Sequence, residues 1–218
     1  MKTFITDPQE IESKSMQIIT EELGAGIDKF DLSEAAVVKR VIHTTADFEY
    51  ADLLGFSPGA LDGALAAFIK GRQVVVTDTN MIATGINKKA LHLFDGRAAC
   101  LVGEEETRQA AEKNGLTRSM INIRRAAEKY PQAIYAIGNA PTALYELLRL
   151  VGEKKVSPVL VVGVPVGFVE AEESKDELRK AAVPHIIVRG RKGGSPVAVA
   201  IINALLKLAA QKQQGAFK

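Results

Sequence analysis

The pattern of hydrophobic and polar residues becomes regular from residue 72 onwards. Beyond this residue, short β-branched runs alternate with amphipathic stretches of helical spacing, and the runs lie at 73–77, 98–102, 133–137, 158–162 and 185–188. Apolar strands separated by helices are typical of a parallel sheet that is covered on both faces. The pattern therefore predicts an α/β protein with a doubly wound, three-layer α/β/α fold around a five-stranded parallel sheet.

Start and stop residues place the helices. Asp7-Pro8 is typical of a helix N-cap, so a first helix should begin there and run to Leu23. Further helices are expected over 33–43, from Ser57-Pro58 to Gly71, and over 104–114, 117–130, 140–152, 170–182 and about 194–211, with 212–218 fraying. We expect a single domain over 1–218, with a helical part (1–71) and a doubly wound core (72–212).

Composition narrows the class of protein. The chain has 218 residues, 47% of them hydrophobic, and a net charge of +2, so it lacks the dominant basic surface of a nucleic-acid binder. No apolar run reaches the roughly 20 residues that span a bilayer, and the N-terminus lacks a secretory signal's apolar stretch. One cysteine and three histidines favour neither a disulfide nor a metal cluster. A cytoplasmic protein without metal, membrane or nucleic-acid partner is expected.

The carboxyl ends of the predicted strands are rich in glycine and small polar residues. Open parallel sheets bind ligands at this edge, and the helix N-termini that follow offer unpaired N–H groups to anions. Short turns also need glycine, but a series of such turns along one edge favours a binding site. The candidate residues from these turns are Asp78, Met81, Asn139, Gly167, Gly193, Gly194 and Ser195.

Nucleotide motifs do not fit these turns. The segment 163–167 is not the dinucleotide fingerprint, and its proline removes a donor that a pyrophosphate loop would use. The segment 189–195 contains glycines, lysine and serine but not in the order of a phosphate-binding P-loop, and no G-x-S-x-G elbow occurs. A nicotinamide enzyme or a P-loop nucleotidase is therefore disfavoured.

The segment after the second helix is dense in reactive residue types. It contains His43, Thr44, Thr45 and Asp47 within five positions. Histidine can gain or lose a proton near neutral pH, so His43 is the acid–base candidate. The alternative is that a histidine at the end of a helix is favoured simply by the helix dipole. From the residues alone both interpretations stay open, whereas His92 and His185 are expected to be structural.

Two further positions are unusual. Ser15 lies on the same side of the first helix as Ile11 and Ile18, where a serine usually bonds its own helix backbone. Arg118, followed by Ser119, begins a predicted helix, where a cation gains nothing from the dipole. A bound anion would explain Arg118, and a salt bridge with a nearby glutamate would explain it equally well.

Several short motifs follow one another in a fixed order over nearly the whole chain. They are ESKS (12–15), VKRVIHTTAD (38–47), FSP (56–58), Thr77-Asp78 with Met81 and Gly85-Ile86, TRS (117–119), IGNAPT (137–142), GVPVGFV (163–169) with ESK (173–175), and GRKGGS (190–195). Together they make the sequence resemble the precorrin-8X methylmutase family (precorrin isomerases), including its cobalt-precorrin-8 relatives. Lys14 and Asn80 depart from the family pattern, where arginine and an acidic residue are frequent.

The resemblance implies a cytoplasmic homodimer with a three-layer α/β fold. The implied reaction moves a ring methyl from C-11 to C-12 of precorrin-8X or cobalt-precorrin-8 and gives hydrogenobyrinate or cobyrinate in cobalamin biosynthesis, with possible hand-over to neighbouring enzymes of the pathway. It implies no cofactor, and His43 as the catalytic residue. The implied contacts to the tetrapyrrole are Ser15, Thr44, Thr45, Asp47, Asp78, Met81, Gly85, Arg118, Ser119, Asn139, Gly167, Gly193, Gly194 and Ser195.

We hypothesise that His43 donates a proton or a strong hydrogen bond to a ring nitrogen near the migrating methyl group. Arg118 and the helix N-termini would bind the carboxylates of the substrate, and Met81 and Phe168 would pack on the ring. Three alternatives remain: a tetrapyrrole carrier that binds without isomerising, a phosphate- or nucleotide-dependent transferase that uses 193–195, and a purely structural module.

Overall fold

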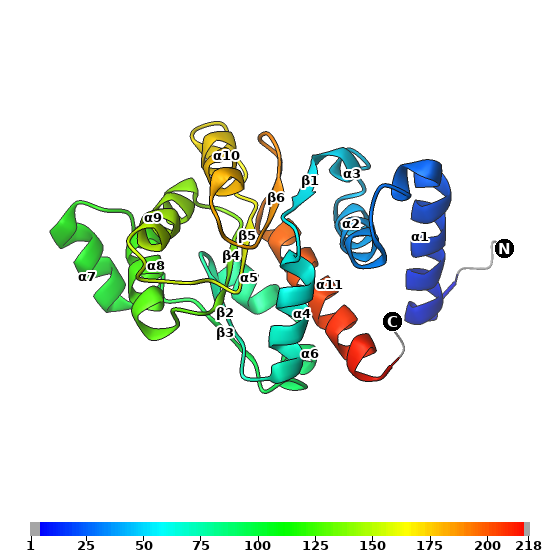
Figure 1. Cartoon of the computed structure of the whole chain (residues 1–218), viewed down its shortest axis with the longest axis horizontal. Helices are drawn as coiled ribbons and strands as arrows, with labels where there is room; N and C mark the ends of the chain where they lie inside the picture. Colours follow the sequence, from blue (N-terminus) through cyan, green and yellow to red (C-terminus); the bar gives the residue numbers. More distant parts are fainter. Residues whose placement is uncertain (1–4, 216–218) are drawn as a thin grey trace.

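The computed structural model describes residues 5–215 and contains one six-stranded sheet (Figure 1). The strand order is β1-β6-β5-β4-β2-β3, and β1 is antiparallel to β6 while all other pairs are parallel. The strands are β1 (Leu54–Phe56), β2 (Val74–Thr77), β3 (Arg97–Ala99), β4 (Ile134–Ile137), β5 (Leu160–Gly163) and β6 (His185–Val188). The predicted α/β fold is confirmed, with one strand more than expected.

The additional strand β1 lies at the sheet edge. Its three residues are too few to show the alternation of a strand, and it forms because Leu54 pairs with Val188 of β6. Strand β3 is also shorter than the predicted run 98–102, because the chain leaves the sheet after Ala99. The backbone N–H of Leu101 then donates to the side chain of Asn122 (2.7 Å) instead of to a neighbouring strand.

Helices cover both faces of the sheet. Alternate residues of a strand point to opposite faces, so Ile134 and Ala136 of β4 enter one hydrophobic cluster and Tyr135 and Ile137 the other. Five helices cover the first cluster: α2 (Leu32–Thr45), α4 (Ala60–Lys70), α5 (Asn80–Gly85), α6 (Lys88–His92) and α11 (Ser195–Gln213). Three helices cover the second cluster: α8 (Arg118–Lys129), α9 (Pro141–Gly152) and α10 (Ala171–Lys180). The three layers are thus as predicted.

The remaining helices lie at the periphery. Helix α1 (Pro8–Leu23) packs on α2 and continues into a 3-10 turn, Gly24–Ile27; α3 (Tyr50–Leu53) follows α2; and α7 (Glu105–Asn114) packs on α8. Figure 1 shows α1 and α7 at opposite ends of the molecule. None of the helices within residues 5–215 is both long and apolar enough to cross a membrane.

Side-chain hydrogen bonds explain where α1 begins and why the predicted start of α4 is wrong. Asp7 accepts from the backbone N–H of Glu10 (2.8 Å), which confirms the predicted start of α1. The expected start at Ser57 is wrong, because the Ser57 hydroxyl instead accepts from the backbone N–H of His185 (2.8 Å), and α4 begins after Gly59.

Other boundaries also differ from the predictions. Helix α2 continues two residues past His43 to Thr45. His92 ends the short helix α6, because the polar stretch between β2 and β3 folds into α5 and α6. Helix α11 extends to Gln213, so the first two residues expected to fray are helical, and residues 216–218 of that stretch lie outside the described residues.

The connections reverse direction between β2 and β4, which are neighbours in the sheet. Strand β2 continues through α5 and α6 on one face, whereas β4 continues through α9 on the other. Such a switch point opens a crevice at the carboxyl ends of the two strands, where open α/β sheets bind their ligands.

Candidate functional site

Asp78 joins the two sides of this crevice. It follows β2, is 1% exposed, and its carboxylate accepts backbone N–H bonds from Gly138 (3.1 Å), Asn139 (2.9 Å) and Ala140 (2.8 Å) after β4. Burial raises the pKa of Asp78, and the three amide donors act against that rise. The carboxylate therefore holds the turn after β4 in place, while Asn139 remains exposed at the sheet edge.

The start of α8 lies beside the same turn. Thr117 caps the helix by accepting from the backbone N–H of Met120 (3.2 Å), and its hydroxyl lies 3.2 Å from that of Thr142 at the start of α9. This contact brings Arg118 and Ser119 to the carboxyl edge of the sheet, as the predicted site requires.

Arg118 is an exposed cation on this edge. It borders a surface hollow of about 570 Å³ between α7 and α8, together with Arg108. Arg108 is paired with Glu105 and Glu112, whereas the guanidinium of Arg118 has no ion pair or hydrogen bond within residues 5–215. The salt bridge that could have explained Arg118 is therefore not formed, and its charge is available to an anion.

The turns after β5 and β6 hold each other in a strained backbone. Gly193 has φ 149°, and a Cβ there would fall inside the 3.0 Å that real Cβ atoms keep from other atoms, against the carbonyl oxygen of Val164. The N–H of Gly194 (φ 119°) donates to that same oxygen (2.8 Å), and the N–H of Gly167 donates to the carbonyl of Arg191 (3.2 Å). Glycine is required at 193 by both its φ angle and this close approach.

Ser195 connects the last turn to β2. It begins α11, is 8% exposed, and its hydroxyl lies 3.1 Å from that of Thr79, which caps α5. Met81, the second residue of α5, is 65% exposed. The turns after β2, β5 and β6 therefore form one surface.

The end of α2 presents the reactive segment. His43 is exposed in the last helical turn, and the helix closes at Ala46 with φ 52°. The hydroxyls of Thr44 and Thr45 donate to the carbonyls of Arg40 and Val41 (2.9 Å each), so both are engaged with their own helix. The position of His43 is consistent with a dipole contact and also with an open acid–base group.

An ion pair attaches this segment to the turn after β6. The Lys192 ammonium pairs with Asp47 and with Glu49 (2.7 Å), and it lies 5.9 Å from the ring centre of Tyr50. The hydrogen bond from Lys192 lowers the pKa of the Asp47 carboxyl. Asp47 therefore holds the end of α2 against the glycine-rich turn, four residues after His43.

A groove of about 540 Å³ runs along the length of α11. Its lining includes Glu12 of α1, Thr44 of α2 and Pro196 of α11. The hydroxyl of Ser15 donates to the Ile11 carbonyl (2.8 Å), the ordinary helical interpretation of that residue.

Gly85 ends α5 and allows it to approach α11 closely. A Cβ at Gly85 would lie 2.8 Å from Val199 of α11. The structure thus gives Gly85 a packing role.

These contacts join one edge of the sheet from end to end. They lead from Arg118 through 139–142, the buried Asp78, 193–195 and Asp47 to His43. Arg118 and His43 lie on helices that cover opposite faces of the sheet, so no direct contact joins them. Only a ligand large enough to cross the sheet edge could contact both.

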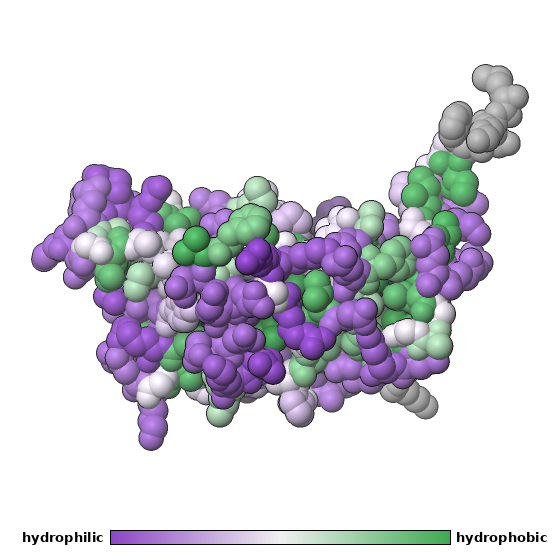
Figure 2. All heavy atoms as spheres, turned by 90° about the horizontal axis from the view of Figure 1, so that it is seen from above, coloured by the Kyte–Doolittle hydropathy of each residue, from purple (hydrophilic) through white to green (hydrophobic). Residues whose placement is uncertain are grey.

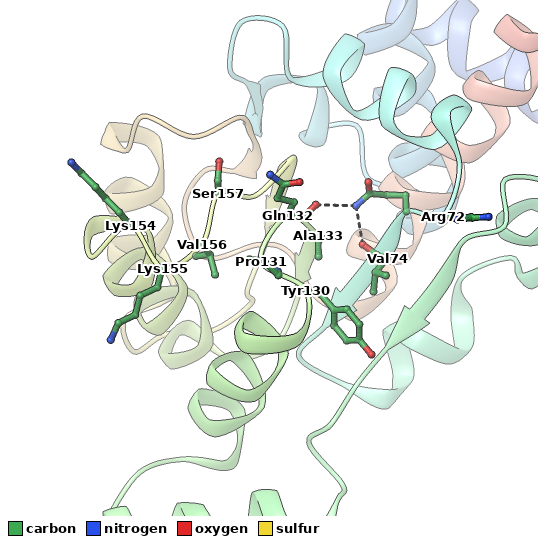
Figure 3. A pocket seen from close by; sticks show the side chains of 11 residues that line it. Arg72, Val74, Tyr130, Pro131, Gln132, Ala133, Lys154, Lys155, Val156 and Ser157 are labelled. Atoms are coloured by element: carbon green, nitrogen blue, oxygen red, sulfur yellow. Dashed lines mark hydrogen bonds between the residues drawn. The ribbon is translucent and has the colours of Figure 1, made fainter.

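The opposite end of the sheet is hollowed as well. A depression of about 510 Å³ is lined by residues such as Tyr130, Gln132 and Ser157, next to the amino ends of β2 and β4. In Figure 3 the side chains of Lys154 and Lys155 extend away from it. Its position opposite the glycine-rich turns makes it a poor candidate for the site.

Comparison with known proteins agrees with the motif order. The model of the precorrin-8X methylmutase family matches residues 10–208. The chain belongs to this family.

Named relatives extend the match over nearly all of the chain. The cobalt-precorrin-8 methylmutase of Priestia megaterium is 43% identical and covers 95% of this chain and 91% of its own length. That of Methanocaldococcus jannaschii is 41% identical (96% and 98%). The crystal structure of the precorrin-8X methylmutase from Thermus thermophilus superposes with a TM-score of 0.86 at 40% identity (96% and 98%). As a methylmutase, the chain is an isomerase of cobalamin biosynthesis that catalyses a methyl shift.

Two lysines of this methylmutase make contacts near the site that no sequence motif predicted. Lys192 belongs to a group of basic residues at 189–192, and its ammonium pairs with Asp47. Lys175 is 1% exposed in α10 and was treated only as part of a motif. A signal for Lys175 was present, since it shares the helical spacing of the buried residues Ala171, Ser174 and Leu178.

Proposed function

We propose that this chain moves the methyl group from C-11 to C-12 of precorrin-8X or cobalt-precorrin-8 and so forms hydrogenobyrinate or cobyrinate. The observation that carries the proposal is the continuous edge between two exposed groups of different chemistry, Arg118 and His43. A tetrapyrrole with several carboxylates has the size to cross that edge, an anionic periphery for Arg118 and ring nitrogens for His43.

His43 acts as the proton donor in this proposal. A proton or strong hydrogen bond at a ring nitrogen draws electron density from the conjugated system and favours migration of the methyl group. General acid catalysis contributes about 10²–10⁴-fold. Because the reaction is an isomerisation, the imidazole regains any proton that it transfers, and the scheme needs neither a cofactor nor a nucleophile.

The remaining contacts hold the macrocycle in place. Arg118 binds a carboxylate, and Met81 and Phe168, which are 65% and 85% exposed, pack on the ring face. The Arg191 guanidinium lies 5.5 Å from the ring centre of Phe168. Figure 2 shows the molecule from above, that is, from the side on which α3 and α10 lie in Figure 1. On this side compact apolar areas lie within hydrophilic surroundings. Such a surface suits a flat apolar ring with acidic side chains.

A direct experiment mixes the purified protein with the metal-free or the cobalt-containing precursor and follows the absorption spectrum. Conversion to the spectrum of the product supports the proposal and identifies the substrate. A spectral shift of bound precursor without product would instead indicate a carrier.

We also propose that the protein is a cytoplasmic homodimer that passes its product to the next enzyme of the pathway. The exposed Ile11 and Ile18, seven residues apart on α1, support a subunit contact there. Light scattering of the purified chain measures the assembly directly.

Replacing Arg118 by alanine should weaken binding of the reaction product about 10- to 100-fold, because a charge-assisted hydrogen bond contributes about 1.5–3 kcal/mol. Spectroscopic titration measures the Kd. The matched control is Arg72→Ala, an exposed arginine at the opposite end of the sheet, which should bind as the parent does. Equal affinity of Arg118→Ala and the parent would remove Arg118 from the site.

Replacing Phe168 by alanine should weaken product binding about fivefold, because covering part of a phenyl ring contributes about 1 kcal/mol. The stability should not fall, since Phe168 is 85% exposed. Leu93→Ala removes another exposed apolar side chain (68%) near the opposite end of the sheet and serves as control. If both variants bind product alike, Phe168 does not contact the ring.

A further inference from the structure

Lys175 is a buried lysine beside the proposed site. It lies on the inner side of α10, is 1% exposed, and shares that side with the buried residues Ala171 and Leu178. Its ammonium donates a hydrogen bond to the backbone carbonyl of Lys192 (2.9 Å). A carbonyl of the glycine-rich turn after β6 therefore accepts a hydrogen bond from a charged donor on its buried side.

Among residues 5–215, no carboxylate forms an ion pair with Lys175. Within the described residues the hydrogen bond to Lys192 is the single polar contact of the ammonium, and burial lowers the pKa of Lys175 to about 8. A buried charge without a partner carboxylate is unfavourable for stability, and an apolar side chain of similar length would fill the same space. We therefore expect the ammonium of Lys175 to contribute to the conformation of the turn that it contacts rather than to overall stability.

Lys192 is held at both ends. Its carbonyl accepts from Lys175, and its side chain pairs with Asp47 and Glu49 at the end of α2. The next residue, Gly193, has a φ angle of 149° and packs against the Val164 carbonyl. The orientation of the Lys192 peptide therefore decides both the path of the turn and the direction of the Lys192 side chain.

We propose that Lys175 is a positioning residue whose buried ammonium fixes the Lys192 peptide, so that Lys192 can hold Asp47 and thereby the end of α2 that carries His43. The inference rests on the proposed function for the role of His43, but the contact chain itself does not depend on the identity of the substrate. Lys175 contacts neither His43 nor any exposed surface, so it acts only through the turn.

The test compares Lys175→Met, which removes the donor and keeps the length, with Lys175→Arg, which keeps a donor. Lys180→Met is the control, because Lys180 is an exposed lysine of the same helix. We expect Lys175→Met to fold and to lose about tenfold in kcat with a smaller change in KM, because small displacements of a catalytic group reduce turnover strongly. Lys175→Arg should recover most of the loss, and Lys180→Met should match the parent.

A double-mutant cycle with Lys192→Met separates positioning from a general structural role. If Lys175 acts through Lys192, then Lys192→Met alone lowers kcat, and adding Lys175→Met lowers it less than about twofold further. Parent-like turnover of Lys192→Met, or independent and multiplying effects, would overturn the proposal. The Lys192 variant changes a partly exposed side chain, so this outcome can be measured even if Lys175→Met fails to fold.

Hydrogen exchange followed by mass spectrometry tests the contacts from Lys175 through Lys192 to Asp47 in the absence of substrate. Peptides that cover 40–50 and 189–195 should exchange faster in Lys175→Met than in the parent and in Lys180→Met. Unchanged exchange at 40–50 in folded Lys175→Met contradicts the inference. Faster exchange together with a parent protein that isomerises neither precursor would leave the positioning role standing and reject the proposed function instead.

Discussion

The His43→Ala variant should lose about 10²–10⁴-fold in kcat while it remains folded, because general acid catalysis contributes a factor of that size. The side chain is exposed at the end of α2, so its removal creates no cavity. A histidine there can stabilise the helix through the dipole by about 0.3–1 kcal/mol, which sets the largest expected loss in stability. Steady-state conversion of the precursor measures kcat, and thermal unfolding measures the stability.

His92→Ala is the matched control for this experiment. His92 is also exposed and also ends a helix, α6, so it shares the dipole contact but lies away from the carboxyl edge. His43→Gln adds a second comparison, since glutamine keeps a hydrogen-bond donor but does not titrate in the neutral range. If His43→Ala converts precursor at the parent rate, His43 is only a helix-terminal residue and the proposed chemistry is rejected.

The layers of the fold were predictable because the buried strands form a simple pattern. Runs such as 158–162 are apolar and rich in β-branched residues, and the helices between them show a buried side, so the alternation alone specifies a covered parallel sheet. Strand β1 was not predictable in this way. Its three residues carry no periodic signal, and only pairing with β6 gives them strand geometry.

The site shows the same division between local and tertiary information. Gly167, Gly190, Gly193 and Gly194 indicate the predicted ligand edge from the sequence, because their positive φ angles require glycine. The partners of Asp78 and Lys192 come from segments about 60 and 145 residues away in the chain. The spacing of residues along the sequence therefore does not predict these contacts. The opposite placement of Arg118 and His43 on the two faces of the sheet follows only from the strand order.

Gly193→Ala should be the most destabilising substitution in these turns, with a loss of about 2–5 kcal/mol. A φ angle of 149° is strained for alanine, which costs about 1–3 kcal/mol, and the added methyl group would collide with the Val164 carbonyl oxygen and force the backbone apart, at a similar cost. For a chain of this size the melting temperature should fall by about 5–15 °C. Thermal unfolding at fixed protein concentration measures the shift.

Gly190→Ala separates the two causes, because Gly190 belongs to the same turn and also has positive φ (70°), yet a Cβ there meets nothing within 4 Å. It should cost about 1 kcal/mol, the ordinary penalty of a left-handed alanine. The two variants should differ in turnover as well. In Gly193→Ala the displaced backbone moves Lys192 and the end of α2, so kcat should fall. In Gly190→Ala the added methyl group meets no neighbouring atom, so the site should keep its geometry. Equal losses of stability for both variants would mean that backbone angle alone requires glycine at 193, and the close approach of the turns after β5 and β6 would then not hold the edge of the site together.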